Sequence, residues 1–420
     1  MSKQFEDRPR YSKRRPKAVQ HSFWIHCILN GPQHETIHHF GSVLQSPQIT
    51  YELNNQKMGI KGLKPLLRSY GVHEYTVPLS QMAGKTIAVD GTFLLHKYKN
   101  CHSVPWHYLT LYTLSNLRMR NVKVLFIFDG MSPPEKSREK SNRRCRKQAL
   151  MEKGALVKAQ LEVWKKDGGE QAPELAAVSE RLVKTRGLDP SLTDPETVQV
   201  LTDYVDNMSR DTRVTSDDYE LMRRSLDAFG FPYADAPDEA ELCCVRLVQM
   251  GIADAPMTID SDALACGALH GVDVIYTDLH GETLTAMSTS KSKEALGLNG
   301  EQFMDLCVMC GTDFNQRVHK LGPVTALKLI KAHGSIENIP SATPSMSCLE
   351  AVRTREILSG GDMESRRKDY EAMVQKPVSA ELIRSVFPPE FLDKLLHENW
   401  QLRDAMKRMA PEAFEKCKRK

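Results

Sequence analysis

The chain has 420 residues, of which 41% are hydrophobic, and a formal net charge of +4. A chain of this length can bury a sizeable core and is long enough for two or three domains. It has no run of the roughly 18 apolar residues that a membrane-spanning helix needs, and no apolar block near the N-terminus followed by a small-residue cleavage site. These features argue against a membrane protein or a secreted one and predict a globular protein inside a cell.

The ten cysteines follow no disulfide framework, and the pair Cys307 and Cys310 has no second pair at zinc-finger spacing. We therefore expect free thiols in a reducing compartment. Basic residues gather in RPRYSKRRPK near the N-terminus and in KSREKSNRRCRK at 136–147. A small net charge names no partner, and a basic cluster by itself is either a solvated face or a nucleic-acid contact.

Taken in chain order, residues 1–57 lack sustained periodicity and are predicted to form a basic extension. Apolar residues at helical spacing then begin the core in MGIKGLKPLL, at 58–67. KTIAVDG and VKVLFIFDG are two short strands that both end in Asp-Gly, with a helix-length amphipathic segment between them. This order favours a parallel sheet whose ligand site lies beyond the carboxyl ends of the strands, where Asp90 and Asp129 are found.

The segment from about 136 to 230 is charged and poor in strand patterns, so we expect a helical insertion there. The sheet resumes with FPYADAP, a helix in EAELCCVRLVQMG, then APMTIDSDALACG and VDVIYTD. The predicted fold class is therefore α/β with a mainly parallel central sheet.

Seven acidic residues lie at the strand ends and helix starts of this pattern: Asp90, Asp129, Glu239, Glu241, Asp260, Asp262 and Asp313. Acid/base catalysis needs only two carboxylates, and seven in one place would repel each other unless cations neutralised them. The pattern predicts a site for two divalent ions, roughly 3.5–4 Å apart, the arrangement used for displacement at phosphodiesters. Any one of these acids alone is more often a helix cap or a turn residue. A structural calcium loop does not fit, because its ligands lie within about twelve residues.

Two acidic doublets support the convergence. Glu239 and Glu241 lie at a predicted helix start, where the first turn can direct both carboxylates to one side, and Asp238 is assigned to capping that helix. Asp260 and Asp262 are expected to share one face of an extended segment at the end of a strand.

Six blocks in this order resemble the successive motifs of the flap endonuclease / XPG family of structure-specific nucleases: MGIKGL, AVDGTFLLHK, FIFDG, APDEAE, TIDSDALACG, and FMDLCVMCGTDF followed by HKLGPVTALKLIKAHGSIENI. The match covers most of 58–340, and six blocks in order are far more specific than any one of them. The resemblance implies a PIN-like nuclease fold with a helical arch and a helix-two-turn-helix motif at about 315–340. It also implies that the seven acids are the metal ligands and that the ions are two Mg²⁺, for which Mn²⁺ can substitute.

The resemblance extends to residues that contact the substrate. The family places a Lys and an Arg after FDG, where they contact the scissile phosphate, and the matching positions are Lys136 and Arg143. Seven residues apart, they would lie on one helical face. His96 matches a ring that stacks on a base, and LLHK is closer to the exonuclease-one branch, which has His there, than to the flap branch, which has Tyr. Such stacking contributes about 1–3 kcal/mol, although a lone His on a helix is more often structural.

HKLGPVTALKLIKAHGSI shows a Gly-Pro turn, an amphipathic helix and a second turn. The resemblance implies that backbone amides and a bound K⁺ hold duplex phosphates there. Gly322 would allow close backbone approach, and Lys320 and Lys328 would add charge. Gly59, in the block that the family packs near its active site, is also assigned to DNA contact.

The sequence predicts five regions: 1–57, basic extension; 58–150, XPG-type N-terminal region; 151–230, helical arch or insertion; 231–340, XPG-type internal region; 341–420, C-terminal helical tail. The insertion is longer than is typical of flap endonucleases, chiefly around 165–210, which puts threading of a free 5′ end in doubt. The extension is either a basic leader or untranslated sequence upstream of an initiator at Met58, and the second interpretation is preferred. The C-terminal EAFEKCKRK lacks the box that recruits the sliding clamp.

We predict a magnesium-dependent, structure-specific 5′ nuclease that hydrolyses DNA at flaps or duplex/single-strand junctions in replication, repair or recombination. We expect a monomer in the nucleus, or in the host nucleus if the compact, divergent sequence is viral. The alternatives are an exonuclease-one-like 5′→3′ activity, an RNA-directed relative, and a non-catalytic DNA-binding scaffold derived from the same fold.

Overall fold

The computed structural model describes residues 59–101, 105–187, 189, 194–340, 346–387, 392 and 400–410. The predicted extension at 1–57 and the C-terminal EAFEKCKRK lie outside the described residues. The described part of the chain forms two compact units. Met151–Arg210 belongs to a helical unit, and the residues on either side of that segment form the sheet unit.

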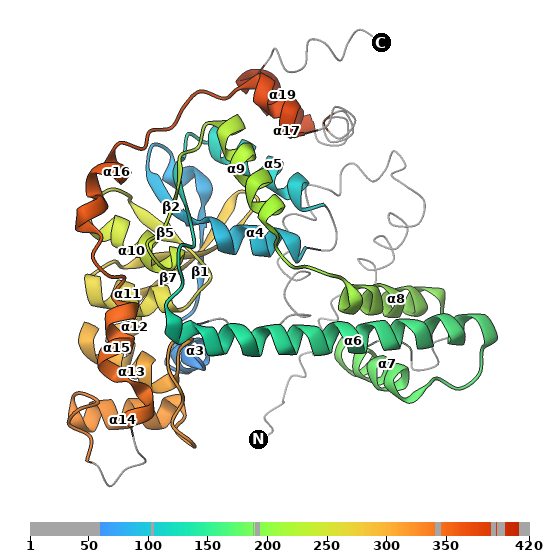
Figure 1. Ribbon diagram of the computed structural model, residues 1–420, viewed down its shortest axis with the longest axis horizontal. Coiled ribbons are helices and arrows are strands. Elements are labelled where there is room, and N and C mark those ends of the chain that lie inside the picture. The colour runs from blue at the N-terminus through green and yellow to red at the C-terminus, as the bar shows by residue number, and fades with distance from the viewer. Residues whose placement is uncertain are drawn as a thin grey trace, which may run out of the picture. The chain divides into compact units, whose positions relative to one another are not determined.

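The sheet unit has a central sheet flanked by helices (Figure 1). Seven described strands form this sheet, in the order β1-β7-β6-β5-β2-β3-β4. The pairs from β6 through β5, β2 and β3 to β4 are parallel, whereas β7 pairs antiparallel with both β1 and β6. The strands are β1 (Tyr75–Pro78), β2 (Thr86–Asp90), β3 (Lys123–Phe128), β4 (Tyr233–Asp235), β5 (Ala255–Met257), β6 (Val274–His280) and β7 (Thr283–Ser288).

Helices cover both faces of the parallel strands, which explains why β2 and β3 are nearly continuous apolar runs. On one face, Leu125 and Ile127 of β3 pack in a cluster with Cys243, Cys244 and other residues of α10. On the opposite face, the ring of Phe128 contacts Tyr219 of α9 edge to face, with centroids 5.9 Å apart. The helices on these faces are α4 (Gly91–Lys99), α5 (Trp106–Met119), α9 (Ser216–Phe229), α10 (Ala240–Gln249) and α16 (Arg367–Glu371). Two more helices pack on them: α17 (Ala380–Val386) on α9 and α19 (Trp400–Met409) on α5.

A second cluster of buried side chains lies among helices beside the sheet. It joins Leu63 of α3, Phe303 of α13, Leu327 of α14 and Leu358 of α15, among others. This packing holds the loop between α13 and α14, and with it Asp313. The helices around this cluster are α3 (Leu63–Ser69), α11 (Asp262–His270), α12 (Thr289–Leu296), α13 (Gly300–Cys310), α14 (Pro323–His333) and α15 (Ala351–Leu358). The described residues of the sheet unit also form four short 3₁₀ helices: η2 (Leu79–Met82), η3 (Pro134–Lys136), η4 (Ser347–Leu349) and η5 (Glu364–Arg366).

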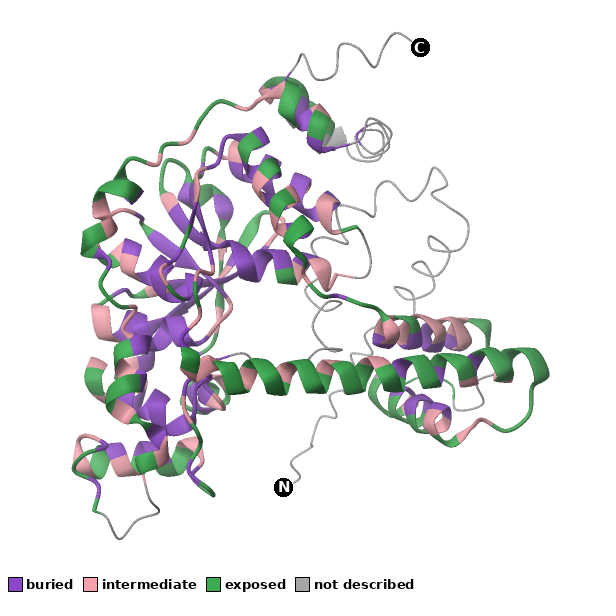
Figure 2. Ribbon diagram, viewed as in Figure 1, coloured by how far each residue is buried: buried purple, intermediate pink, exposed green. Residues whose placement is uncertain are grey.

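The helical unit contains the second half of the long helix α6 (Ser137–Asp167) together with α7 (Pro173–Arg186) and α8 (Pro195–Ser209). Val157 and Leu161 of α6 pack with apolar residues of the other two helices, so this unit has a small core of its own. A Cβ on Gly154 would lie 2.7–2.8 Å from the backbone of Met208 and Ser209, so only glycine permits this approach of α6 to α8. Elsewhere along α6 most residues are exposed (Figure 2).

The fold class predicted from the sequence is confirmed: an α/β protein with a mainly parallel sheet. The crossover between β2 and β3 contains two helices, α4 and α5, where a single helix-length segment was predicted. The boundaries of the five predicted regions stay a prediction. Among the described residues, the eight cysteines form no disulfide, as predicted, and no helix is both long and apolar enough to cross a bilayer.

Candidate metal centre

Four parallel strands end at the same edge of the sheet, and acidic residues follow each of them. Asp90 is the last residue of β2 and caps α4, accepting a 2.8 Å hydrogen bond from the amide of Phe93. Asp129 follows β3, and its Oδ1 accepts a 3.0 Å bond from the amide of Ala240 at the start of α10. The other acids follow β4, β5 and helix α13, so one edge of the fold receives all seven predicted carboxylates.

These carboxylates form two groups that have the geometry of cation sites. One oxygen from each of Asp129, Glu239 and Glu241 can come within 4.8 Å of the other two, and so can one from each of Glu241, Asp260 and Asp262. Glu241 belongs to both groups, which places the two candidate sites side by side. The prediction that the doublets converge is therefore confirmed in geometry, while the binding of metal by these residues stays a prediction.

Several oxygens of the cluster are buried without a partner. Oε1 of Glu239, Oε1 of Glu241, Oδ1 of Asp262 and Oδ1 of Asp313 make no hydrogen bond to any described residue. Their residues are only 1–4% exposed. Buried polar atoms are almost always satisfied, and hard carboxylate oxygens are the preferred ligands of Mg²⁺, so the donor set fits divalent cations.

The electrostatics of the cluster agree with this fit. Burial, followed by repulsion from Asp129, raises the pKa of Asp90 to about 8. Burial, followed by the charges of Asp260 and Asp313, raises the pKa of Asp262 well above its usual range. The pKa of Glu241 is also raised, first by burial and then by the neighbouring acids, even though Lys136 opposes the shift. A raised pKa means that the ionised form of these acids is disfavoured unless a positive charge lies close to it.

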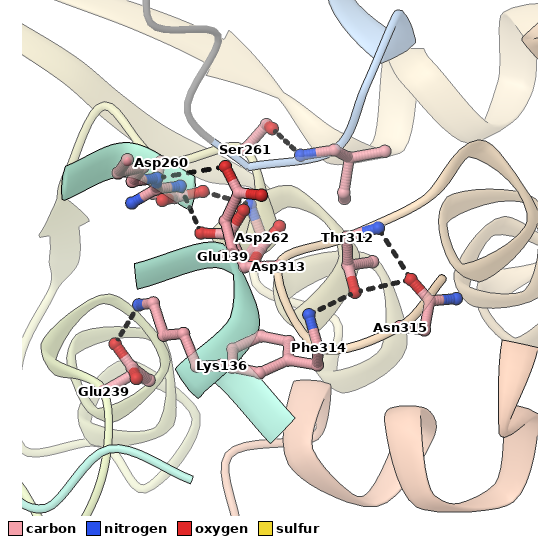
Figure 3. Close-up of polar contacts among 12 residues, drawn as sticks. Lys136, Glu139, Glu239, Asp260, Ser261, Asp262, Thr312, Asp313, Phe314 and Asn315 are labelled. Atoms are coloured by element: carbon pink, nitrogen blue, oxygen red, sulfur yellow. Dashed lines mark hydrogen bonds and ion pairs between the residues drawn. The ribbon is translucent and has the colours of Figure 1, made fainter. Parts of the chain in front are cut away.

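Two basic side chains supply part of that positive charge. Lys136 pairs with Glu239, and Arg143 pairs with Asp313 (Figure 3 shows the first pair). Burial alone would lower the pKa of Lys136, but Glu241 and Glu239 outweigh it and the net shift is upward. Both residues were predicted to share a helical face. The structure instead places Lys136 at the end of the 3₁₀ helix η3, just before α6, and Arg143 within α6.

Two details of the predicted doublets are wrong. Asp238 does not cap α10: the N-cap residue is Glu239, whose side chain makes no capping bond, and the carboxylate of Asp129 receives the first amide instead. Asp260 and Asp262 do not lie on an extended segment either. Asp262 is the first residue of α11, and its amide donates to Oδ1 of Asp260 at 3.0 Å, so a turn brings the two together. At α10, a long-range contact from Asp129 replaces the predicted cap. At α11, a turn replaces the predicted extended segment.

Thr258 orients two of the acids, although it was not among the predicted site residues. Its hydroxyl is fully buried, donates to Oδ2 of Asp90 at 2.9 Å, and accepts from the amide of Asp260 at 3.2 Å. On the neighbouring strand end, the amide of Asp129 donates to the hydroxyl of Thr92 at 2.9 Å. A threonine two residues before an acidic doublet at a strand end was the available signal.

Gly59 lies against the cluster. A Cβ at this position would collide with the carboxylate of Asp260 and with the side chain and amide of Ser261. The next amide, of Ile60, donates to Oγ of Ser261 at 2.7 Å, and Lys61 donates to the carbonyl of Gly311 at 3.0 Å. The first described residues thus pack onto the loops that carry the acids.

The other predicted DNA-contacting residues are spread over two elements. His96 lies on α4, and its side chain is exposed. Its pKa is lowered, first by the loss of water around the ring and then by the charges of Lys147 and Arg143. Lys320 is exposed and has a positive φ of 61°, Gly322 is the N-cap of α14 with open space beside it, and Lys328 is exposed on α14. The fold brings none of the last three into the acidic cluster, and their role in DNA contact stays a prediction.

Comparison with known proteins agrees with this arrangement. The XPG N-terminal domain model matches residues 58–150, and the XPG I-region model matches residues 230–313. A putative RAD2-like endonuclease of Frog virus 3 is 98% identical over 363 residues, which is 86% of this chain and 100% of the relative. The chain belongs to the RAD2-like family of nucleases. Enzymes of this family hydrolyse phosphodiester bonds, and the predicted resemblance is confirmed.

More distant members of the RAD2-like family show lower identity. A probable RAD2-like endonuclease of Invertebrate iridescent virus 6 is 28% identical, over 67% of this chain and 73% of its own. Flap endonuclease 1 of Meyerozyma guilliermondii is 25% identical, over 67% of this chain and 70% of its own. Among solved structures, the catalytic core of Rad2 in complex with DNA substrate aligns with a TM-score of 0.48 and 17% identity, over 84% of this chain and 100% of that one.

Proposed function

We propose that this RAD2-like protein is a magnesium-dependent, structure-specific 5′ nuclease that cuts DNA phosphodiester bonds at flaps or duplex/single-strand junctions. The observation that carries the proposal is the set of four buried, unpartnered carboxylate oxygens in a cluster of seven acids. Oxygen ligands alone, without Cys or His, favour Mg²⁺, and Mn²⁺ can take its place. The curated relatives named flap endonuclease support the choice of substrate.

In this proposal, Asp129, Glu239 and Glu241 hold one ion, and Glu241, Asp260 and Asp262 hold a second. When bound, two divalent ions supply an activated water and neutralise charge on the leaving oxygen.

The protein's own groups position the substrate. Lys136 and Arg143, at the rim of the acidic cluster, present two cations to the scissile phosphate. His96 stacks on a base next to the cut. Gly59, Lys320, Gly322 and Lys328 contact the DNA, and a K⁺ ion in the 315–340 motif helps to hold duplex phosphates without reading their sequence.

A cleavage assay tests the proposal. A 5′-labelled flap duplex with Mg²⁺ should be cut near the junction, and cleavage should stop with EDTA and in Asp262→Ala. Asp227→Ala, an exposed aspartate on α9, is the matched control and should cut like the wild type. If the wild type cuts no faster than Asp262→Ala, the protein is a non-catalytic DNA-binding scaffold and the proposal is wrong.

A second candidate is a 5′→3′ exonuclease of the exonuclease-one type, which His96 in LLHK favours. Product length separates the two: stepwise mononucleotide release from a nicked or blunt duplex indicates the exonuclease, and a single flap-sized product indicates the endonuclease. An RNA flap of the same geometry tests the RNA-directed alternative.

We further propose that the protein acts as a monomer in the nucleus, which would be the host nucleus for a viral enzyme. The viral relative at 98% identity supports the viral origin. Sedimentation of the purified chain and imaging of the tagged protein in infected cells test these two points. A dimer, or a signal confined to the cytoplasm, would contradict them.

A further inference from the structure

Helix α15 (Ala351–Leu358) is anchored to the sheet unit by its buried face. Ile357 and Leu358 pack into the second core, and the hydroxyl of Thr354 donates to the carbonyl of Leu349 at 2.9 Å. The same helix carries two arginines, Arg353 and Arg355, whose guanidinium groups pair with acids of other segments. A helix fixed in this way can hold its arginines at defined positions.

Arg355 connects α15 to the segments on both sides of α14. Its guanidinium pairs with Asp305 of α13 and makes a bidentate contact with Glu337, at 2.7 and 3.0 Å. Asp305 is 4% exposed and also accepts a 3.0 Å bond from the amide of Ile336. Bidentate Arg–carboxylate contacts fix geometry as well as charge, so α15 is tied to α13 and to the last part of the predicted duplex-binding motif at 315–340.

Arg353 reaches in the other direction, to the start of the arch. Its Nε donates to Oε1 of Glu135 at 2.8 Å, across 218 residues of sequence. Glu135 lies in η3 directly before Lys136, the cation that pairs with Glu239 and lies 5.7 Å over the ring of Phe314 (Figure 3). The second carboxylate oxygen of Glu135 is buried and has no partner among the described residues, so Arg353 supplies the contact that holds this side chain.

We propose that the Glu135–Arg353 pair is a positioning contact that holds η3, and through it Lys136, in place for cleavage, and so couples the α13–α14 region to the catalytic cation. The inference rests on the proposed nuclease function for the role of Lys136. Among the described residues, Arg353 pairs with Glu135 and Glu356 and with none of the acids of the metal cluster, so it is a positioning residue that acts through Glu135.

An ordinary surface ion pair is the competing explanation, since Arg353 is half exposed and such pairs contribute little to stability. The two explanations differ in what a charge reversal does. If the contact is only a surface pair, reversing one charge would change neither the rate of the cleavage step nor the local order of η3. A positioning contact would change both, because small displacements of a catalytic group cost rate even when the fold is intact.

The experiment is a charge swap in the full chain: Arg353→Glu, Glu135→Arg and the double variant. We expect each single reversal to lower the single-turnover cleavage rate of the 5′-flap duplex by about three- to tenfold at saturating enzyme, with little change in DNA affinity. The double variant should recover most of the loss, and Arg353→Lys should stay near the wild type. Glu356→Gln removes the other carboxylate partner of Arg353, at 3.3 Å, and is the matched control expected to have no effect.

Hydrogen exchange provides a readout that does not depend on cleavage. Amides of residues 135–140 should exchange faster in each single reversal and return to the wild-type rate in the double variant. Unchanged rates and exchange in both single variants, or a double variant that recovers neither, would overturn the proposal. If the wild type itself does not cut, the proposed function fails, and the exchange result alone then decides whether the contact positions η3.

Discussion

Lys136 and Arg143 each neutralise one buried carboxylate at the rim of the acidic cluster. A cation in this position serves two purposes: it lowers the repulsion among the acids and can face a phosphate as negative charge builds up on it. Lower repulsion stabilises the fold, whereas a cation facing the phosphate speeds cleavage. Substitution of each residue can distinguish the two effects.

We expect Lys136→Ala and Arg143→Ala each to lower the cleavage rate by about 10²- to 10³-fold, because each removes a preorganised cation from the reacting phosphate. Single-turnover kinetics on the flap duplex measures the loss. Arg138→Ala, an exposed residue near the start of α6, is the control and should change the rate little. A loss of similar size in the control would mean that general charge attraction to DNA, rather than position, is responsible.

Asp278 shows how a buried acid behaves when its partners are fixed by the fold. Burial raises the pKa of Asp278, but the interactions with Lys97 and then His280 outweigh burial. The resulting pKa lies below the ordinary value of 3.8. The folded state therefore binds a proton less tightly than the unfolded state. The resulting stabilisation is present above pH 4 or so and is lost as the pH falls through the folded pKa.

Asp278→Asn should lower the free energy of unfolding by about 3 kcal/mol at pH 7, because it leaves the mostly buried charge of Lys97 unpaired. The difference from the wild type should stay constant between pH 7 and about 4 and should shrink as the pH is lowered further, through the folded pKa. Urea unfolding across this range measures it, with the exposed Asp227→Asn as control. A difference independent of pH would show that lost packing, not charge, is the cause.

At the scale of single elements, the first described residues and the loop before α11 depend on each other. Gly59 has a φ of 68° and no room for a Cβ, whereas Gly71 has a similar φ of 79° and open space around it. The two glycines therefore separate the cost of a left-handed backbone from the cost of a collision at the acidic cluster.

Gly71→Ala should cost about 1 kcal/mol in unfolding free energy, from backbone conformation alone. Gly59→Ala should cost a further 1–3 kcal/mol or so, because the methyl group displaces Asp260 and Ser261, and it should also lower cleavage. Chemical denaturation and the flap assay measure the two effects. Equal costs for the two variants would argue against close packing of Gly59 on the cluster.

At the scale of the whole molecule, the chain has two units with separate cores. Separate cores allow local unfolding of one unit without loss of the other. The helical unit is small, so its stability depends on a few buried side chains. Leu161 of α6 is one of them, at 1% exposed, whereas Leu156 of the same helix is 48% exposed.

Leu161→Ala should destabilise the helical unit by about 2–4 kcal/mol, through the cavity that it leaves. Hydrogen exchange should then be faster across Met151–Arg210 and unchanged in β2, β3 and β5. Leu156→Ala is the matched control and should change protection by less than about 0.5 kcal/mol. Equal loss of protection in the sheet would show that the two units unfold together.

Local sequence patterns were enough to predict the fold class, the main strands and which acids cluster. Apolar runs ending in Asp-Gly mark parallel strands, and the carboxyl ends of such strands meet at one edge of a sheet. Asp90 and Asp129 could therefore be placed together from the sequence alone. Patterns of this kind are readable because they depend only on residues that are close in the chain.

The packing of distant elements selected the partner of each of these residues. Asp129, not Asp238, receives the first amide of α10, and Thr258 orients Asp90. Arg353 meets Glu135 across 218 residues. No local pattern encodes such pairs, because they form only when the tertiary structure brings side chains from separate elements within hydrogen-bond distance.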